Sequence, residues 1–147
     1  MSVDAITIHA CAVLIGPKAA LIRGTAGSGK SRLVWDLLQS TLPFTRLVGD
    51  DRVHVQAAGG CLLVRPAPAL AGMLEIRGLG IRRLPYEPVA AAGLVVDLTA
   101  VDAARLPAPE AGNAVIEGVI LPRLAVAGGR PALPMVLAFL RAPPAGD

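Results

Sequence analysis

The chain has 147 residues, of which 54% are hydrophobic and 17% are charged. This length suits one domain with a buried core, and this composition excludes an intrinsically disordered chain. A formal charge of +3 with 3% aromatic residues and no long basic run argues against a nucleic-acid-binding protein. The longest uncharged stretch, Ala5 to Pro17, is shorter than the roughly 20 residues that span a bilayer. We therefore expect a single domain over residues 1–147 that does not cross a membrane.

The first residues and the cysteines indicate the cellular compartment. Asp4 lies near the start, and no basic region precedes an apolar run, so a secretory signal is not predicted. Cys11 and Cys61 lie far apart and outside any metal-binding spacing, so we expect two buried free thiols. A cytoplasmic protein is the resulting prediction.

The first third of the chain predicts a β-hairpin, a glycine-rich loop and a helix. Apolar runs predict strands over Ile6–Ile15 and Ala19–Arg23, joined by a tight turn. A helix is predicted from Lys30 to about Gln39, because apolar residues recur there at helical spacing. These residues are Leu33, Val34, Leu37 and Leu38.

The rest of the chain is predicted to be mainly β, because short apolar runs alternate with glycine and proline. The predicted strands lie in residues 41–48, 52–56, 61–65, 73–77, 81–84, 93–98, 115–121 and 124–127. Pro131 begins a last predicted helix that ends at about Arg141. Residues 142–147 are expected to form a flexible tail.

A phosphate-binding loop is predicted where the sequence GTAGSGKS matches the P-loop pattern GxxxxGK[ST], between a predicted strand and a predicted helix. Its glycines allow successive backbone N–H groups to surround a phosphate. Lys30 would contact the β and γ phosphates, and the Ser31 hydroxyl would ligate Mg²⁺. The chain has only one other lysine, Lys18, which supports a specific role for Lys30. A helix-capping turn is the structural alternative. The predicted nucleotide contacts are Gly24, Thr25, Ala26, Gly27, Ser28, Gly29, Lys30 and Ser31.

An aspartate pair follows the next predicted strand. Asp50 and Asp51 come at a strand end, which is where ligands bind in open α/β sheets. Phosphoryl transfer needs a carboxylate near Mg²⁺ and a base that orients the attacking hydroxyl. The pair could supply both, although a simple Asp-Asp turn is an alternative.

A third unusual stretch is LEIRGLGI, residues 74–81, in which Glu75 and Arg77 alternate along a predicted strand. Gly78 and Gly80 lack the context of a dinucleotide-binding fingerprint, so a simple β-bend is equally compatible with these residues.

These segments together resemble the HPr kinase/phosphorylase family in its short form, with the catalytic domain only. The resemblance runs from HACAVLI through GTAGSGKS, LVGDDRV and LEIRGLGI to LPRLAVAGGR, over about residues 6–135. It implies an α/β fold, in which a P-loop nucleotide-binding core has a mixed, β-rich sheet similar to the nucleotide-binding domain of phosphoenolpyruvate carboxykinase.

The resemblance also implies an ATP- and Mg²⁺-dependent kinase that phosphorylates a serine of HPr or an HPr-like phosphocarrier protein, and that can dephosphorylate it by phosphorolysis. Asp50 would act as the base, and the metal would be held by Ser31, Asp51 and Glu75. His9 would hold the aspartate pair, with a core histidine as the alternative. Arg105 would approach the transferred phosphate, and the acceptor protein would contact Arg77, Gly78 and Arg130. For Arg105 and Arg130, a solvated surface position is the alternative.

Other functions and assemblies remain open at this point. A nucleotide-sensing regulatory module that has lost phosphotransfer is the main alternative, and a small-molecule kinase or general NTPase is a third. Thr25 and Arg32 stand where the family often has acidic residues. A homo-oligomer is also compatible with the sequence.

Overall fold

The computed structural model describes residues 5–145. Two α-helices, α1 (Lys30–Leu38) and α2 (Ala132–Arg141), and two 3-10 helices, η1 (Pro68–Leu70) and η2 (Pro109–Gly112), accompany the strands. The strands are β1 (Ile6–Ile8), β2 (Cys11–Ile15), β3 (Lys18–Arg23), β4 (Thr45–Gly49), β5 (Val53–Ala58), β6 (Cys61–Pro66), β7 (Met73–Ile76), β8 (Gly80–Arg83), β9 (Ala90–Asp97), β10 (Asn113–Ile116) and β11 (Val119–Ala125).

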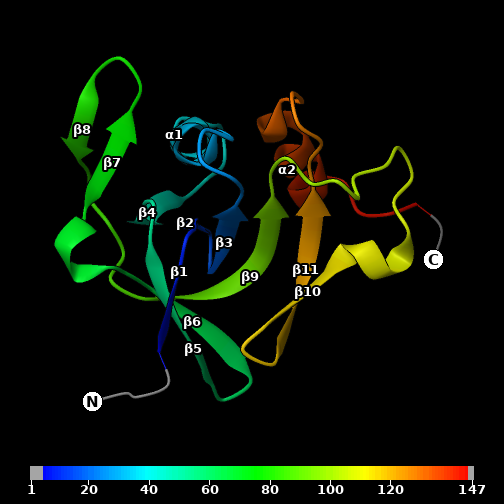
Figure 1. Ribbon diagram of the computed structural model, residues 1–147, viewed down its shortest axis with the longest axis horizontal. Coiled ribbons are helices and arrows are strands. Elements are labelled where there is room, and N and C mark those ends of the chain that lie inside the picture. Colours follow the sequence, from blue (N-terminus) through cyan, green and yellow to red (C-terminus); the bar gives the residue numbers. More distant parts are fainter. Residues whose placement is uncertain (1–4, 146–147) are drawn as a thin grey trace.

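Nine strands form one curled, mixed sheet, and β7 and β8 form a separate hairpin (Figure 1). The strand order is β1-β5-β6-β9-β3-β2-β4, and the β10–β11 hairpin joins the sheet where β11 pairs with β9. This arrangement confirms the predicted mixed α/β, β-rich architecture.

The sheet brings four strand ends to one edge, which we call the strand-end edge. Strand β9 runs parallel to both β3 and β11. Strand β2 is antiparallel to both β3 and β4, so β4 runs in the same direction as β3. The carboxyl ends of β3, β4, β9 and β11 therefore share an edge, which is where open α/β sheets bind ligands.

The core has two parts, one on each face of the central strands. Helix α1 covers one face, where Leu33, Val34 and Leu37 pack with Ile22 of β3, and Val136 of α2 belongs to the same cluster. On the other face, the curl of the sheet encloses a second apolar cluster. Central strands buried on both faces explain the near-continuous apolar runs in the sequence.

Two predicted strands are wrong because a turn divides each of them. The run 6–15 breaks at His9 and Ala10, so that β1 pairs with β5 while β2 pairs with β3 and β4. The run 115–121 breaks at Glu117 and Gly118, whose φ angles are 50° and 77°. Two consecutive positive φ angles are typical of a tight hairpin turn, and they create the β10–β11 hairpin.

Three smaller findings concern the ends and the thiols. Residues 142–145 are exposed and irregular, and residues 146–147 of the predicted tail lie outside the described residues. The expectation of two buried thiols is correct for Cys11 and wrong for Cys61, which is exposed at the start of β6. Within residues 5–145, neither helix is long and apolar enough to cross a bilayer.

Candidate functional site

The glycine-rich loop, residues 24–31, leaves the end of β3 and leads into α1. Gly27 and Gly29 have φ angles of 79° and 98°, a backbone region that side-chain-bearing residues rarely adopt. Gly29 is the N-cap of α1, so the unpaired N–H groups of the first helical turn open toward the loop. Such a helix start favours an anionic group.

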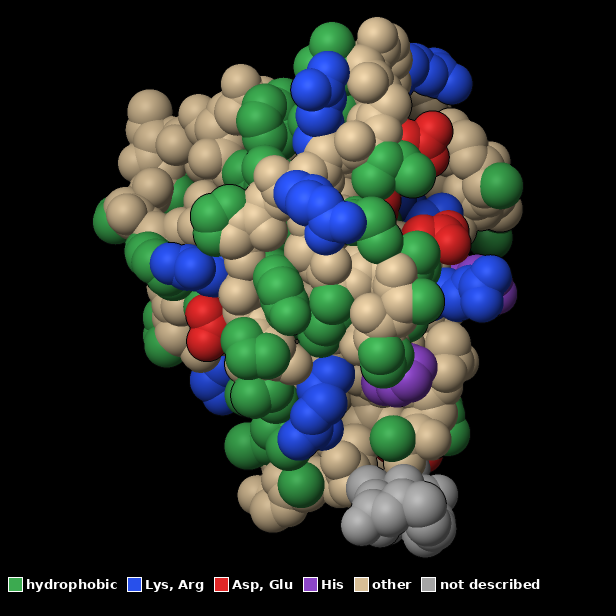
Figure 2. Space-filling model, turned by 90° about the vertical axis from the view of Figure 1, so that its left-hand side faces the viewer, with side chains coloured by type: hydrophobic (Ala, Val, Ile, Leu, Met, Phe, Trp, Pro, Cys, Tyr) green, Lys and Arg blue, Asp and Glu red, His purple; other side chains and the backbone are tan. Residues whose placement is uncertain are grey.

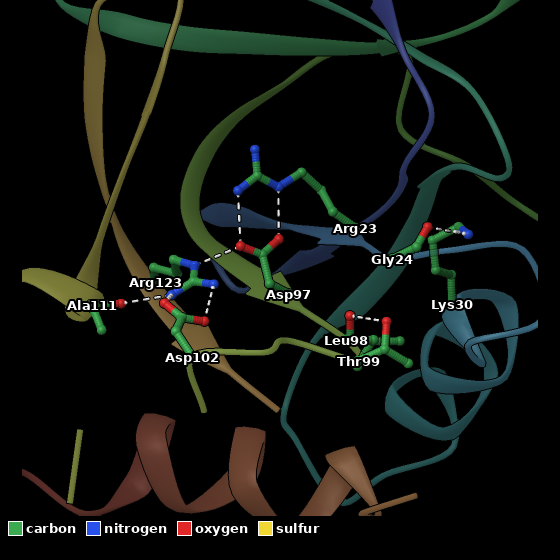
Figure 3. A network of polar contacts seen from close by, with 9 residues as sticks. All are labelled: Arg23, Gly24, Lys30, Asp97, Leu98, Thr99, Asp102, Ala111 and Arg123. Carbon is green, nitrogen blue, oxygen red and sulfur yellow. Dashed lines mark hydrogen bonds and ion pairs between the residues drawn. The ribbon is translucent and has the colours of Figure 1, made fainter. Parts of the chain in front are cut away.

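Two polar side chains lie inside this loop. The Lys30 ammonium donates a hydrogen bond of 2.9 Å to the carbonyl oxygen of Gly24 (Figure 3). It donates a second bond, of 3.1 Å, to the carbonyl oxygen of Thr25. The Ser28 hydroxyl is buried and has no hydrogen-bond partner among the described residues. A Cβ on Gly24 would lie 2.4 Å from this hydroxyl and 3.1 Å from the Leu98 Cβ, so a larger residue there would force its neighbours to shift. A buried hydroxyl without a partner is unfavourable unless a bound group satisfies it, which fits a phosphate in this loop.

Asp50 follows β4 and is the one buried charged residue in the described part of the chain, with 7% of its surface exposed. Its Oδ1 accepts hydrogen bonds from the Ser31 hydroxyl at 2.6 Å and from the Cys11 thiol at 3.0 Å. Its Oδ2 accepts a hydrogen bond of 3.1 Å from the backbone N–H of Glu75. This carboxylate therefore joins the glycine-rich loop, β2 and β7 at the strand-end edge.

The Cys11 thiol lies behind the Asp50 carboxylate and is fully buried. Burial, together with the neighbouring Asp50 carboxylate, raises the pKa of this thiol to about 12. The thiol thus stays protonated and donates to Asp50, while its sulfur accepts the backbone N–H of Asp51 at 3.4 Å.

Asp51 has a different environment from Asp50. Its side chain is exposed and lies 3.8 Å from the Arg52 guanidinium. Its φ angle is 68°, and the Arg52 N–H donates to the Asp50 carbonyl across it at 2.7 Å, which makes a γ-turn. A non-glycine residue in this region is strained, and such strain concentrates at functional sites.

The β7–β8 hairpin places the LEIRGLGI segment beside Asp50. Glu75 contributes its backbone N–H to the site, whereas its side chain is exposed. Arg77 and Gly78 form the turn of the hairpin, where the Leu79 N–H donates to the Ile76 carbonyl oxygen. Gly78 has a φ angle of 91°. Figure 2 shows the side of the molecule that carries this hairpin, with Lys and Arg side chains scattered among hydrophobic ones. The exposed side chains of the hairpin include Arg77, Leu79, Ile81, Arg82 and Arg83.

The other three predicted site residues are not drawn into this cluster. His9 is exposed in the bend before β2, so the alternative of a core histidine does not hold. Arg105 lies in the exposed segment between β9 and η2, and Arg130 lies just before α2. Within residues 5–145, none of the three makes a hydrogen bond or ion pair to another side chain.

A charged network that sequence reasoning missed occupies the neighbouring part of the same edge (Figure 3). Asp97, the last residue of β9, accepts bonds of 2.7 Å and 2.9 Å from the Arg23 guanidinium and a third bond from Arg123. Burial raises the pKa of Asp97, but the hydrogen bonds from the two arginines outweigh it and hold that pKa below its usual range. Hydrogen bonds to Arg123 likewise lower the pKa of Asp102. The sequence does contain one signal for this network, which is Arg123 inside the apolar run 119–125. An arginine in such a run needs an acidic partner.

A comparison with models of protein families shows to which family the chain belongs. Residues 3–84, which include the glycine-rich loop, Asp50, Asp51 and the β7–β8 hairpin, match the HPr serine kinase C-terminal domain. The chain belongs to this family. The resemblance found in the sequence is thereby confirmed.

Curated relatives extend the same relationship. The chain is 38% identical over 99 residues to the HPr kinase/phosphorylase of Lactococcus lactis subsp. lactis, covering 67% of this chain and 30% of that protein. It is 42% identical over 76 residues to the HPr kinase/phosphorylase of Streptococcus thermophilus, covering 51% and 24% respectively. The aligned regions thus span less than a third of these relatives.

A solved family structure matches the fold over nearly the whole chain. The HPr(Ser) kinase/phosphatase from Coxiella burnetii superposes with a TM-score of 0.75 at 22% identity, covering 92% of this chain and 88% of that chain. The similarity includes the part after residue 84, which the family model does not reach.

Proposed function

We propose that this protein is an ATP-dependent kinase that phosphorylates a serine of an HPr-like phosphocarrier protein. The observation that carries the proposal is the 2.6 Å hydrogen bond between Ser31 of the glycine-rich loop and Asp50 at the end of β4. It joins a loop suited to phosphate and a buried carboxylate at one edge of the sheet. The names of the curated relatives support the acceptor class.

The glycine-rich loop would bind the phosphates of ATP. The first N–H groups of α1 and the unpartnered Ser28 hydroxyl would donate to phosphate oxygens. Lys30 would exchange its two carbonyl partners, Gly24 and Thr25, for the β and γ phosphates.

Ser31 and Asp50 are the residues that would hold Mg²⁺. Their oxygen atoms are of the type this ion prefers, and Mg²⁺ is usually held by one or two carboxylates plus substrate phosphates. This fits the finding that no three His, Cys, Asp or Glu side chains gather as a metal site within residues 5–145. When bound, the ion would neutralise charge that develops on the transferred phosphoryl group.

The geometry favours Asp50 as the residue that holds the metal and Asp51 as the base. These are the reverse of the roles that the sequence suggested. Asp50 accepts three hydrogen bonds and still has acceptor capacity for a metal ion, which suits a residue that fixes Ser31 and the metal. Asp51 is exposed, which suits a base that must reach the hydroxyl of an acceptor protein. Asp51 would take the proton of the acceptor serine, and in the phosphorolytic direction it would return a proton to that oxygen.

The acceptor protein would dock on the β7–β8 hairpin beside this base. The hairpin exposes three arginines and two large apolar residues, Leu79 and Ile81, which are 61% and 68% exposed. A mixed basic and apolar surface of this kind fits a protein partner with acidic and apolar groups. Arg105 would approach the transferred phosphate, and Arg130 would lie at the rim of the acceptor site. The enzyme would act in the cytoplasm.

Transfer of ³²P from ATP to HPr-like proteins of the same cell, in the presence of Mg²⁺, tests the proposal. We expect acid-stable labelling of serine with the unchanged protein and with Lys18→Ala, the matched control, and none with Lys30→Ala. Binding of Mg-ATP without labelling of any such protein would overturn the proposal and favour the nucleotide-sensing module.

A further inference from the structure

The segment between β9 and β10 is held by one guanidinium. Arg123 on β11 donates to both carboxylate oxygens of Asp102, at 2.8 Å and 2.9 Å, and to the carbonyl oxygen of Ala111 at 3.0 Å (Figure 3). Asp102 and Ala111 are the residues on either side of the 103–110 loop, which contains Arg105. Arg123 therefore holds the two ends of this loop together.

The 103–110 loop has little other support. Its backbone hydrogen bonds are local: the Ala103 N–H donates to the Ala100 carbonyl oxygen at one end, and the Ala111 N–H donates to the Ala108 carbonyl oxygen at the other. Its side chains make no hydrogen bond or ion pair to another described residue, and Leu106 is 80% exposed. The contacts of Arg123 are therefore the side-chain hydrogen bonds and ion pairs that restrain the two ends of the loop, beside the packing of η2 against β11.

The same guanidinium connects the loop to the phosphate-binding end of the sheet. Arg123 also donates to Asp97, which is bound by Arg23, the residue directly before Gly24. The Leu98 N–H donates to the Arg23 carbonyl at 2.8 Å, and a Cβ on Gly24 would lie 3.1 Å from the Leu98 Cβ. The segment that leads into the 103–110 loop thus starts beside Gly24, and Arg123 ties the base of the loop to the end of β9.

We infer that Arg123 and Asp102 are positioning residues, which hold the ends of the 103–110 loop so that Arg105 reaches the transferred phosphate. This inference rests on the proposed function. A bidentate arginine–carboxylate pair suits the task because it fixes direction as well as distance. Asp102 is half-exposed, so its replacement removes the restraint without opening the core.

A double-mutant cycle on kcat and KM separates positioning from general stabilisation. We expect Asp102→Asn to lower kcat about tenfold with the KM for ATP changed less than about twofold, and to have no further effect in an Arg105→Ala protein. Asp36→Asn, which breaks an ion pair with Arg32 on α1, is the matched control. An equal loss of kcat with and without Arg105 would overturn the inference, as would no loss in either protein.

Limited trypsin digestion provides a readout that does not depend on kinase activity. We expect cleavage after Arg105 to be several-fold faster in Asp102→Asn than in the unchanged protein or in Asp36→Asn. An unchanged cleavage rate would overturn the inference even if the kinase is active. Faster cleavage in a protein that labels no acceptor would support the restraint and contradict only the proposed function.

Discussion

Ser31 and Asp50 come from two elements 19 positions apart and share a hydrogen bond of 2.6 Å at the start of α1. Asp50 is almost fully buried, so the bond fixes the hydroxyl in one direction. A bond between an ionised acceptor and a hydroxyl is about twice as strong as one between neutral groups. The Ser31–Asp50 pair thus fixes the arrangement of the site through contacts within the protein.

Replacement of Ser31 by Ala should weaken Mg-ATP binding. We expect a loss of tenfold or more in affinity, on the order of what one lost ligand contact contributes, while ATP binding without Mg²⁺ changes little. Ser31→Thr keeps the hydroxyl and should restore most of the affinity. Calorimetric titrations with and without Mg²⁺ measure the difference, and equal affinities for the Ala and unchanged proteins would contradict the metal role.

Replacement of Asp51 by Gly should separate stability from activity. Glycine adopts a φ of 68° without strain, so we expect the free energy of unfolding to rise by about 1 kcal/mol. Serine labelling should nevertheless be lost, because the proposed base is gone. Asp51→Asn is the control that removes the base while keeping a side chain at this position. Full labelling by either variant would show that Asp51 is not the base.

The two thiols should differ sharply in reactivity. Cys61 is exposed and should be modified by a thiol reagent within minutes, whereas Cys11 is buried and has its pKa raised to about 12. The thiolate is the reactive form, so Cys11 should react only as the protein unfolds. Mass spectrometry of the native protein after a pulse of iodoacetamide gives the two rates, with Cys61→Ser as the control. Similar rates for both thiols would show that Cys11 is not shielded.

Replacement of Asp97 by Asn should destabilise the protein in a pH-dependent way. The pKa of Asp97 is held low by Arg23 and Arg123, so its ionised form stabilises the fold at pH values above the ordinary carboxyl pKa. This contribution is lost as the pH falls through the lowered pKa of the folded state. We expect a loss of about 2 kcal/mol at pH 7 and a much smaller difference near pH 3.

Urea unfolding at the two pH values measures this difference. Asp36→Asn, at an exposed pair, should have little effect at either pH. A destabilisation by Asp97→Asn that does not change with pH would point to packing rather than charge.

The glycine-rich loop, α1 and the aspartate pair could be predicted from the sequence because their signals are local. Strand, glycine spacing and helical periodicity stand next to one another over residues 19–39. The contacts of Asp50 with Cys11 and with the Glu75 N–H could not be predicted, because they join residues that meet only in the folded sheet. The same holds for Asp97 and Arg123, whose pairing follows from the parallel register of β9 and β11.

The turn at Glu117 and Gly118 was missed for another reason. The apolar run 115–121 reads as one strand, and a single glycine within it does not identify a two-residue turn. Only the pairing of Asn113 with Pro122 and of Ile116 with Val119 defines the hairpin.

The position of β9 has a consequence for how the protein folds. This strand follows the region that carries the glycine-rich loop and both aspartates, yet it lies between β6 and β3 in the sheet. Until β9 is in place, β3 has no partner on one side and the two halves of the sheet are not joined. Pairings this distant in sequence slow folding. A chain still being synthesised would therefore contain every residue proposed to bind ATP and Mg²⁺ before it could arrange them, so nucleotide affinity should emerge abruptly once β9 has been made.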